Sequence, residues 1–258
     1  MKNTDRLHDP EITIARQPQH QLTLTMRFAI ISDLHSNLEA LQKALELIDQ
    51  ESVQEIVCLG DIVGYGADPN ECVNLVRSRC RIVLRGNHDA AAVNPLNAES
   101  FTRNARIAAE WTRQQLSPEN RRYLEGLPYT ASRDGILFVH ASPYQPESWF
   151  YVLSEEDLES AFQNFSEQLC FIGHSHFPGI FSEEGPAKTV SRGLRYLINV
   201  GSIGQPRDGN AKLSFGIFDT ERWEYRNIRS EYPIQIAAEK IIRAGLPRAL
   251  ADRLPLGM

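Results

Sequence analysis

The sequence predicts an α/β protein in which two packed β-sheets are enclosed by helices. The first observation is that short, continuous apolar runs alternate with amphipathic helical segments, as expected for strands buried on both faces. The second is that the pattern changes after Tyr196 to several consecutive strands. No internal repeat or low-complexity linker interrupts the chain, so a single domain over residues 26–258 is expected.

Five apolar runs mark the strands that are expected before Tyr196. They cover residues 28–31, 56–59, 82–84, 136–139 and 170–172. Their length and continuity are typical of strands that contact other elements on both faces. Three further strands then follow in succession, over residues 196–200, 213–219 and 223–228.

Six helices are expected between and after these strands. Residues 37–50 place leucine and isoleucine at helical spacing behind Asn37, which is a suitable N-cap. Residues 69–79 start with a proline in the first turn. Residues 154–165 start with Ser154, an N-cap that is followed by acidic residues. The remaining helices are expected at residues 99–116, 118–124 and 233–244.

The composition excludes several classes of protein. An apolar content of 42% and a charged content of 23% are those of a globular chain, not of a disordered or fibrous one. The net charge of −6 and the lack of a long basic run argue against long nucleic acid as a partner. No run of about 20 apolar residues is present, so no membrane span is expected.

Residues 1–25 are polar and lack an apolar stretch of signal-peptide length. We therefore expect a flexible leader in front of the domain and a cytoplasmic protein. In an alternative interpretation, the alternating Ile12, Ile14, Leu22 and Leu24 add an edge strand.

The four cysteines form no CxxC pair. Cys58 and Cys170 lie inside apolar runs, which is typical of reduced thiols in a core. A structural zinc site made of cysteines is therefore not expected.

Five short polar motifs follow five of the predicted strands. In order they are Ser32-Asp33-Leu34-His35, Gly60-Asp61, Gly86-Asn87-His88-Asp89, His140 and Gly173-His174-Ser175-His176. The carboxyl ends of strands are where open α/β sheets collect their ligand groups. Taken singly, such motifs are more often loop caps or strand-end histidines, but their joint occurrence after five strands favours a shared site.

These motifs supply seven candidate metal ligands without a thiolate. They are Asp33, His35, Asp61, Asn87, His140, His174 and His176. Mixed nitrogen and oxygen donors suit Mn, Fe, Co, Ni or Zn. Seven ligands are too many for one such ion but suit two ions that share a bridging carboxylate. Two ions about 3.5–4 Å apart are used for in-line attack on phosphorus.

The same motif series, in this order and spacing, resembles the calcineurin-like metallophosphoesterase superfamily over roughly residues 26–220. The stretches at residues 60–70 and 199–209 are similar to its compact bacterial and archaeal phosphodiesterase-like branch. The resemblance implies a four-layer α/β/β/α sandwich, in which two mixed sheets carry helices on both outer faces. It also implies a metal-dependent hydrolase that acts on phosphate esters.

The resemblance further implies a role for each motif residue. Two divalent transition-metal ions are expected, first of all Mn or Fe, with Ni, Co or Zn as alternatives. Asp61 would bridge them, and a hydroxide between the ions would attack phosphorus. His88 would not bind metal but would protonate the leaving oxygen or stabilise the phosphorane. One ion would be held by Asp33, His35 and His176, and the other by Asn87, His140 and His174.

One departure from the protein-phosphatase branch bears on the substrate. In that branch the second motif continues with an aspartate that orients the catalytic histidine and an arginine that binds phosphate. Gly64 and Tyr65 stand here instead, which disfavours a phosphoprotein phosphatase. A small phosphate ester or phosphodiester of nucleotide type is favoured, with a dinucleoside polyphosphate as one candidate. A non-catalytic interaction module on the same fold is the other alternative, disfavoured because every ligand and His88 are retained.

Two further features bear on substrate binding. Arg207, in a glycine-rich loop before the late strands, could bind phosphate oxygens through its planar guanidinium, although a solvated loop arginine explains it equally well. Trp149, Phe150 and Tyr151 could stack on a nucleobase, although an apolar cluster after a loop is more often part of a core.

Overall fold

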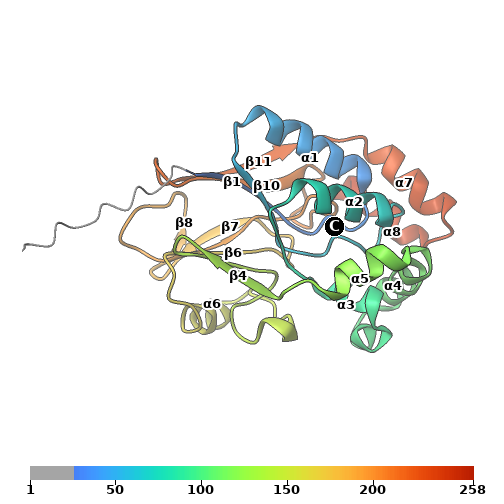
Figure 1. The fold of residues 1–258 in the computed structure, drawn as a ribbon, viewed down its shortest axis with the longest axis horizontal. Coiled ribbons are helices and arrows are strands. Elements are labelled where there is room, and N and C mark those ends of the chain that lie inside the picture. The colour runs from blue at the N-terminus through green and yellow to red at the C-terminus, as the bar shows by residue number, and fades with distance from the viewer. Residues whose placement is uncertain (1–25) are drawn as a thin grey trace, which may run out of the picture.

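The structure, a computed structural model, describes residues 26–258. Two β-sheets pack face to face between outer layers of helices (Figure 1). This arrangement is the predicted four-layer fold. The expectations for residues 1–25 lie outside the described residues. Among residues 26–258, no helix is both long and apolar enough to cross a membrane.

The first sheet has five strands in the order β11-β10-β1-β2-β3. The strands β1 (Arg27–Ile31), β2 (Glu55–Cys58) and β3 (Ile82–Val83) run parallel. The strands β10 (Leu213–Asp219) and β11 (Glu224–Ser230) continue the sheet in antiparallel pairing. The three parallel strands therefore end at the same edge, where the first three polar motifs begin.

The second sheet has six strands in the order β4-β5-β6-β9-β7-β8. Its three central strands, β5, β6 and β9, run parallel, and the outer strands pair in antiparallel fashion. The strands are β4 (Thr130–Arg133), β5 (Ile136–Val139), β6 (Leu169–Ile172), β7 (Gly179–Ser182), β8 (Gly185–Ala187) and β9 (Tyr196–Asn199).

Helices cover both outer faces (Figure 1). Most of them share one apolar cluster with the outer face of the first sheet: α1 (Leu38–Gln50), α2 (Pro69–Arg79), α3 (Asn87–Val93), α4 (Arg103–Gln115), α5 (Pro118–Glu125), α7 (Ile234–Arg243) and α8 (Arg248–Asp252). The outer face of the second sheet packs against α6 (Glu155–Phe162). Short 3-10 helices occur at Pro95–Ala98, Pro146–Ser148 and Leu254–Leu256.

Successive side chains of a strand point to opposite faces of its sheet, so one strand can pack against the other sheet and against the helices. In β1, Phe28 and Ile30 face the second sheet, whereas Ala29 and Ile31 face the helices. Between the sheets, the ring centroids of Phe28 and Phe138 lie 6.2 Å apart. Because both faces of the central strands are apolar, their polar groups are confined to the strand ends, where the motifs lie.

All eight predicted strands and all six predicted helices are found, with shifts at their ends. The helix expected from residue 99 begins at Arg103, because the Thr102 side chain caps it by accepting a hydrogen bond from the Ala105 N–H. Five further elements were not predicted from the sequence: α3, β4, β7, β8 and α8. These are short elements, and β4 alternates between exposed and half-buried side chains, so no apolar run marks it.

Candidate metal centre

The five polar motifs lie at the carboxyl ends of β1, β2, β3, β5 and β6, as predicted. Backbone hydrogen bonds fasten neighbouring motifs to each other. The Asp33 N–H donates to the Gly60 carbonyl at 3.0 Å, and the His35 N–H donates to the Asp61 carbonyl at 2.9 Å. In the second sheet, the Gly173 N–H donates to the His140 carbonyl at 2.9 Å. The loops therefore form one connected framework.

Five of the motif residues hold their backbone in the left-handed region, with φ between 50° and 65°: Asp33, His35, Asp61, His174 and His176. Such a backbone costs a non-glycine residue on the order of 1–3 kcal/mol and persists only where the surroundings enforce it. Aspartate and histidine tolerate it better than most residues. The fold thus fixes these side chains in directions that the chain alone would not favour.

Glycines allow the motifs to approach one another closely. A Cβ atom on Gly86 would collide with the Asp61 carboxylate, and one on Gly173 would collide with the Asp33 carboxylate. Gly86 is therefore needed for contact between two loops of the first sheet, and Gly173 for contact between a loop of the second sheet and one of the first.

Asp33, His35 and His176 form a first group of candidate metal ligands, here called the first ligand group, and all three are buried. His176 Nε2 lies 3.2 Å from Asp33 Oδ1 and 3.1 Å from His35 Nε2. The Nδ1 atom of His176 donates to the Gln205 carbonyl, and that of His35 donates to the Val63 carbonyl at 3.3 Å. In the neutral rings, two Nε2 lone pairs therefore face each other, an arrangement that a cation stabilises.

Asp61, His140 and His174 form the second group. Asn87 joins it through Oδ1, which lies 3.3 Å from His140 Nε2. Asp61 Oδ2 lies 3.5 Å from His140 Nε2 and 3.7 Å from His35 Nε2, so this oxygen stands between the two groups. Its other oxygen accepts a hydrogen bond of 2.8 Å from the His88 backbone N–H.

The electrostatics of the cluster favour bound cations. Burial lowers the pKa of His35 far below its usual value and that of His174 to about 3, so both imidazoles are neutral at pH 7. Burial opposes ionisation of Asp61, but His140 and His88 hold the pKa of its carboxyl below the usual value. Burial also acts against a charged His140, yet Asp61 and Asp33 raise its pKa to about 9. Here a proton compensates the buried carboxylates, as a metal ion would.

Buried polar atoms without a partner support the same conclusion. Asp33 Oδ1 and His174 Nε2 are buried and accept no hydrogen bond from the described residues. Such atoms are costly unless a ligand satisfies them. The donor set therefore fits divalent transition-metal ions. Proximity alone does not separate His88 from the ligands, because it also lies in a possible metal-binding group with His35 and Asp61.

His88 lies at the start of α3, and aromatic rings hold its imidazole in place. The ring centroids of Tyr65 and Phe101 lie 4.4 Å and 4.6 Å from that of His88. A Cβ atom on Gly64 would lie 2.5 Å from His88 Nδ1. Burial, opposed by Asp61, lowers the pKa of His88 to about 4. The histidine is thus positioned by packing.

Arg207 lies beside the first ligand group. Its Nη2 atom is 3.3 Å from Gln205 Oε1 and 3.4 Å from the Tyr65 hydroxyl. A second arginine, Arg253, was not predicted to lie here, and its guanidinium is 4.3 Å from the Tyr65 ring centroid. Arg253 comes from the C-terminal segment, far from any motif, and no sequence pattern marked it.

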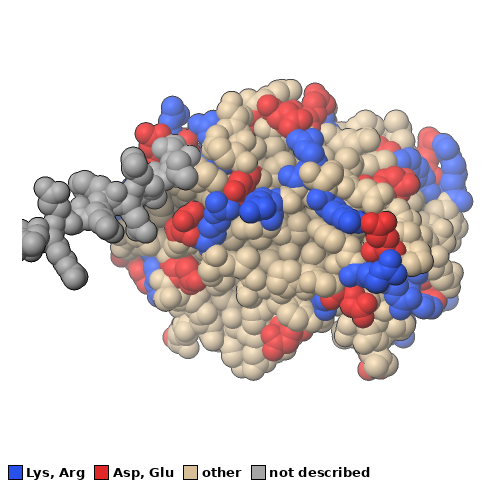
Figure 2. Space-filling view, in the orientation of Figure 1, with Lys and Arg blue, Asp and Glu red and all other residues tan. Residues whose placement is uncertain are grey.

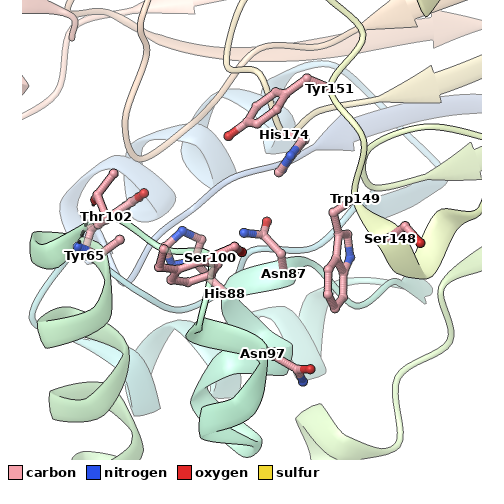
Figure 3. A pocket seen from close by; sticks show the side chains of 12 residues that line it. Tyr65, Asn87, His88, Asn97, Ser100, Thr102, Ser148, Trp149, Tyr151 and His174 are labelled. Carbon is pink, nitrogen blue, oxygen red and sulfur yellow. Dashed lines mark hydrogen bonds between the residues drawn. The ribbon is translucent and has the colours of Figure 1, made fainter.

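A cavity of about 350 Å³ opens beside the second ligand group (Figure 3). Asn87, His88 and His174 line it on the side of the candidate ligands, and Trp149 and Tyr151 are among the aromatic residues that line the rest. Tyr151 stacks on the His174 ring with centroids 4.1 Å apart. Of the three aromatic residues noted in sequence, two thus line the site, whereas Phe150 is not part of the cavity wall.

Residues 26–222 match the family described as the calcineurin-like phosphoesterase superfamily domain. The chain belongs to this superfamily. It is therefore a hydrolase of the phosphoesterase class, and its histidine and aspartate cluster could bind metal.

Related proteins agree with this membership. The chain is 41% identical to the uncharacterized protein MJ0912 of Methanocaldococcus jannaschii, over 89% of this chain and 97% of that one. It is 26% identical to the phosphodiesterase YfcE of Escherichia coli, over 76% of this chain and 89% of that one. The crystal structure of a metallophosphoesterase from Sphaerobacter thermophilus superimposes with a TM-score of 0.82 and 38% identity, covering 91% of this chain and all of the other.

Proposed function

We propose that this phosphoesterase uses two divalent transition-metal ions to hydrolyse a small phosphate ester or phosphodiester of nucleotide type. The main support is the position of Asp61 Oδ2, 3.5 Å from His140 Nε2 and 3.7 Å from His35 Nε2. A carboxylate oxygen between two ligand groups is suited to a bridging role. The resemblance to phosphodiesterase YfcE supports phosphodiesters as substrates.

The assignment of ligands follows the two groups. Asp33, His35 and His176 bind one ion, Asn87, His140 and His174 bind the other, and Asp61 is shared. Mn or Fe are proposed as the native ions, and Ni, Co or Zn fit the same donors. Ions bound there polarise the phosphoryl oxygens and lower the pKa of coordinated water.

The remaining roles belong to His88 and Arg207. A neutral imidazole carries one N–H, which His88 can direct at the leaving oxygen from the inner wall of the cavity. An anionic phosphate beside the ring favours its protonated form, against the effect of burial on its pKa. Arg207, on the side of the first ligand group, orients the phosphate through its planar guanidinium. His88 therefore acts on the leaving group and Arg207 on the group that is retained.

The surface supports a small substrate. Figure 2 shows lysine and arginine interspersed with aspartate and glutamate over the visible face, not one continuous basic field. Long nucleic acid is bound chiefly by such basic fields. The cysteines are free thiols, and three of the four are buried, which agrees with a reducing compartment such as the cytoplasm. A phosphoprotein would have to reach the centre past Tyr65, which packs on His35 and His88.

The test is a substrate screen with protein loaded with Mn²⁺. We expect metal-dependent hydrolysis of bis(p-nitrophenyl) phosphate and of nucleotides, with weaker action on a phosphoserine peptide. Elemental analysis should give two ions per chain. A protein that binds two ions and hydrolyses the peptide fastest would contradict the proposed substrate class, and a single ion per chain would contradict the dinuclear centre.

A further inference from the structure

The cavity beside the ligand cluster combines aromatic rings with uncharged polar groups. Its wall includes Phe101, Trp149, Tyr151, Asn97, Ser100 and Thr102. No lysine, arginine, aspartate or glutamate occurs among the described residues that line it. Its volume of about 350 Å³ is within the range of pockets that hold small organic ligands. The chemistry of the wall therefore suits a flat, neutral, hydrogen-bonding group.

Trp149 and Tyr151 line the cavity, and neither they nor Phe150 belong to an apolar core cluster of the described residues. Tyr151 is 46% exposed and Phe150 is 48% exposed. Trp149 has a φ of 51°, a strained conformation for a bulky residue. The Tyr129 ring lies 6.2 Å from it. In Figure 3 the indole faces His88 and Ser100 across the cavity. The strained backbone at Trp149 thus places the indole ring where a flat ligand in the cavity can stack on it.

Positive charge lies at one edge of the cavity. Arg207 contacts Gln205 and the hydroxyl of Tyr65, which is part of the cavity wall, and it lies close to Tyr151, another residue of that wall. Away from Arg207, the cavity is lined by Asn87 and His88 at the start of α3 and by His174 of the second ligand group. A phosphate between these sides would place its charged, retained part toward Arg207. Its leaving group would then enter the neutral cavity.

We propose that the cavity binds the leaving group of the substrate as an uncharged nucleoside, with its base stacked on Trp149. This inference rests on the proposed function. In the reaction one water is consumed: its oxygen bonds to phosphorus while the bond between phosphorus and the nucleoside oxygen breaks. Protonated His88 gives one proton to that oxygen and becomes neutral, and the proton released by the attacking water passes to solvent, from which His88 is protonated again, so the nucleoside leaves as a neutral alcohol.

The proposal narrows the substrate class. Nucleoside monophosphates, and phosphodiesters with a nucleoside as leaving group, meet the requirement of a neutral leaving group. A dinucleoside polyphosphate cut within its phosphate chain does not, because its leaving group would bring phosphate charge into a cavity whose described lining residues include no lysine or arginine. Asn97, Ser100 and Thr102 offer hydrogen bonds to the base or the sugar.

Binding is tested with adenosine, an uncharged probe, by calorimetry on protein loaded with Mn²⁺. Stacking on an aromatic side chain is worth about 1–3 kcal/mol per base, so Trp149→Leu should weaken adenosine binding by about 10-fold or more. The matched control is Phe150→Leu, an exposed neighbour outside the cavity wall, which should bind adenosine as the parent does. If Trp149→Leu fails to fold, Ser100→Phe fills the cavity from an exposed position and should weaken binding as well.

Kinetics separate this inference from the proposed function. Trp149→Leu should raise KM for adenosine monophosphate about 10-fold or more, but leave KM for ethyl phosphate unchanged. Hydrolysis of p-nitrophenyl esters without any adenosine binding would overturn the inference and leave the proposed function standing. If no ester is hydrolysed, the proposed function fails, while calorimetry with adenosine still decides whether the cavity binds a nucleoside. Faster cleavage of diadenosine tetraphosphate than of adenosine monophosphate would also overturn the inference.

Discussion

The buried ligand cluster and the cavity beside it are built in opposite ways. Asp33, Asp61 and His140 are at most 1% exposed and belong to five short motifs at strand ends. Apart from Tyr65, Ala105 and the motif residues Asn87, His88 and His174, the cavity wall consists of exposed or half-buried residues of two segments, 97–102 and 148–151, that lie between the regular strands. The cluster carries charge, and the wall carries aromatic and neutral polar groups.

This difference suits two separate tasks: the chemical step in the cluster and recognition of the leaving group in the wall. Metal ligands must converge within a few ångströms, so they are held on strand ends and fixed by a strained backbone. A wall that surrounds a leaving group needs only shape and neutral hydrogen-bonding groups, which loops and helix starts can supply. Changes in the cluster should therefore abolish turnover, whereas changes in the wall should alter substrate preference.

The largest effect is expected for Asp61→Ala. Without the shared carboxylate both ion sites are weakened and the cations face each other unshielded. Loss of one positioned proton donor lowers turnover by about 10²–10⁴-fold. The loss of turnover in Asp61→Ala should be larger than that. Elemental analysis should show metal lost from both sites, whereas Asn87→Ala should mainly empty one. Retention of two ions by Asp61→Ala would contradict the bridging role.

His88→Asn tests whether His88, which contacts both the cluster and the cavity, binds metal or donates a proton. A proton donor that binds no metal can be removed without loss of the ions, so the effect should fall on the chemical step, by about 10²–10⁴-fold. The loss should be large for an alkyl phosphodiester and much smaller for a nitrophenyl ester, which needs no protonation. Metal content serves as the control: if it falls, His88 is a ligand. Equal losses on both esters would indicate stabilisation of the phosphorane.

Metal removal should affect stability through the cluster alone. Each ion present at 100 times its dissociation constant stabilises a fold by about 2.7 kcal/mol, so removal of two ions by a chelator should lower the Tm by about 10–20 °C in a domain of this size. The same chelator should hardly change the Tm of Asp61→Ala, which has already lost its ions. If the chelator leaves the Tm of the parent protein unchanged, that result would argue against ions bound to the native state.

The smallest effect is expected in the wall, for Ser100→Ala. The change removes one exposed hydroxyl and no hydrogen bond within the described chain. Loss of a single neutral hydrogen bond costs about 0.5–1.5 kcal/mol, so KM for adenosine monophosphate should rise by about 2–10-fold. Turnover of p-nitrophenyl esters and metal content should stay at parent values. A fall in metal content would show that wall and cluster are not separate.

Much of the fold could be predicted because its pattern is local. The strands buried on both faces have continuous apolar runs, and caps such as Asn37 and Ser154 mark helix starts. The elements that were missed are short or lie at sheet edges, where no apolar run is required; β4, with its alternating exposure, is an example. The helix α3 was missed because Gly86, its N-cap, offers no side chain as a signal.

The sequence by itself determined the fold class and predicted which motif residues the strand ends bring together, because motif order after apolar strands is a property of neighbouring residues. Only the tertiary structure decided their geometry. It placed Asp61 between His35 and His140, and it brought Arg253 from the C-terminal segment onto Tyr65. Likewise it turned the Trp149 indole toward the cavity. These contacts join residues far apart in the chain, and such long-range packing leaves no periodic mark in the sequence.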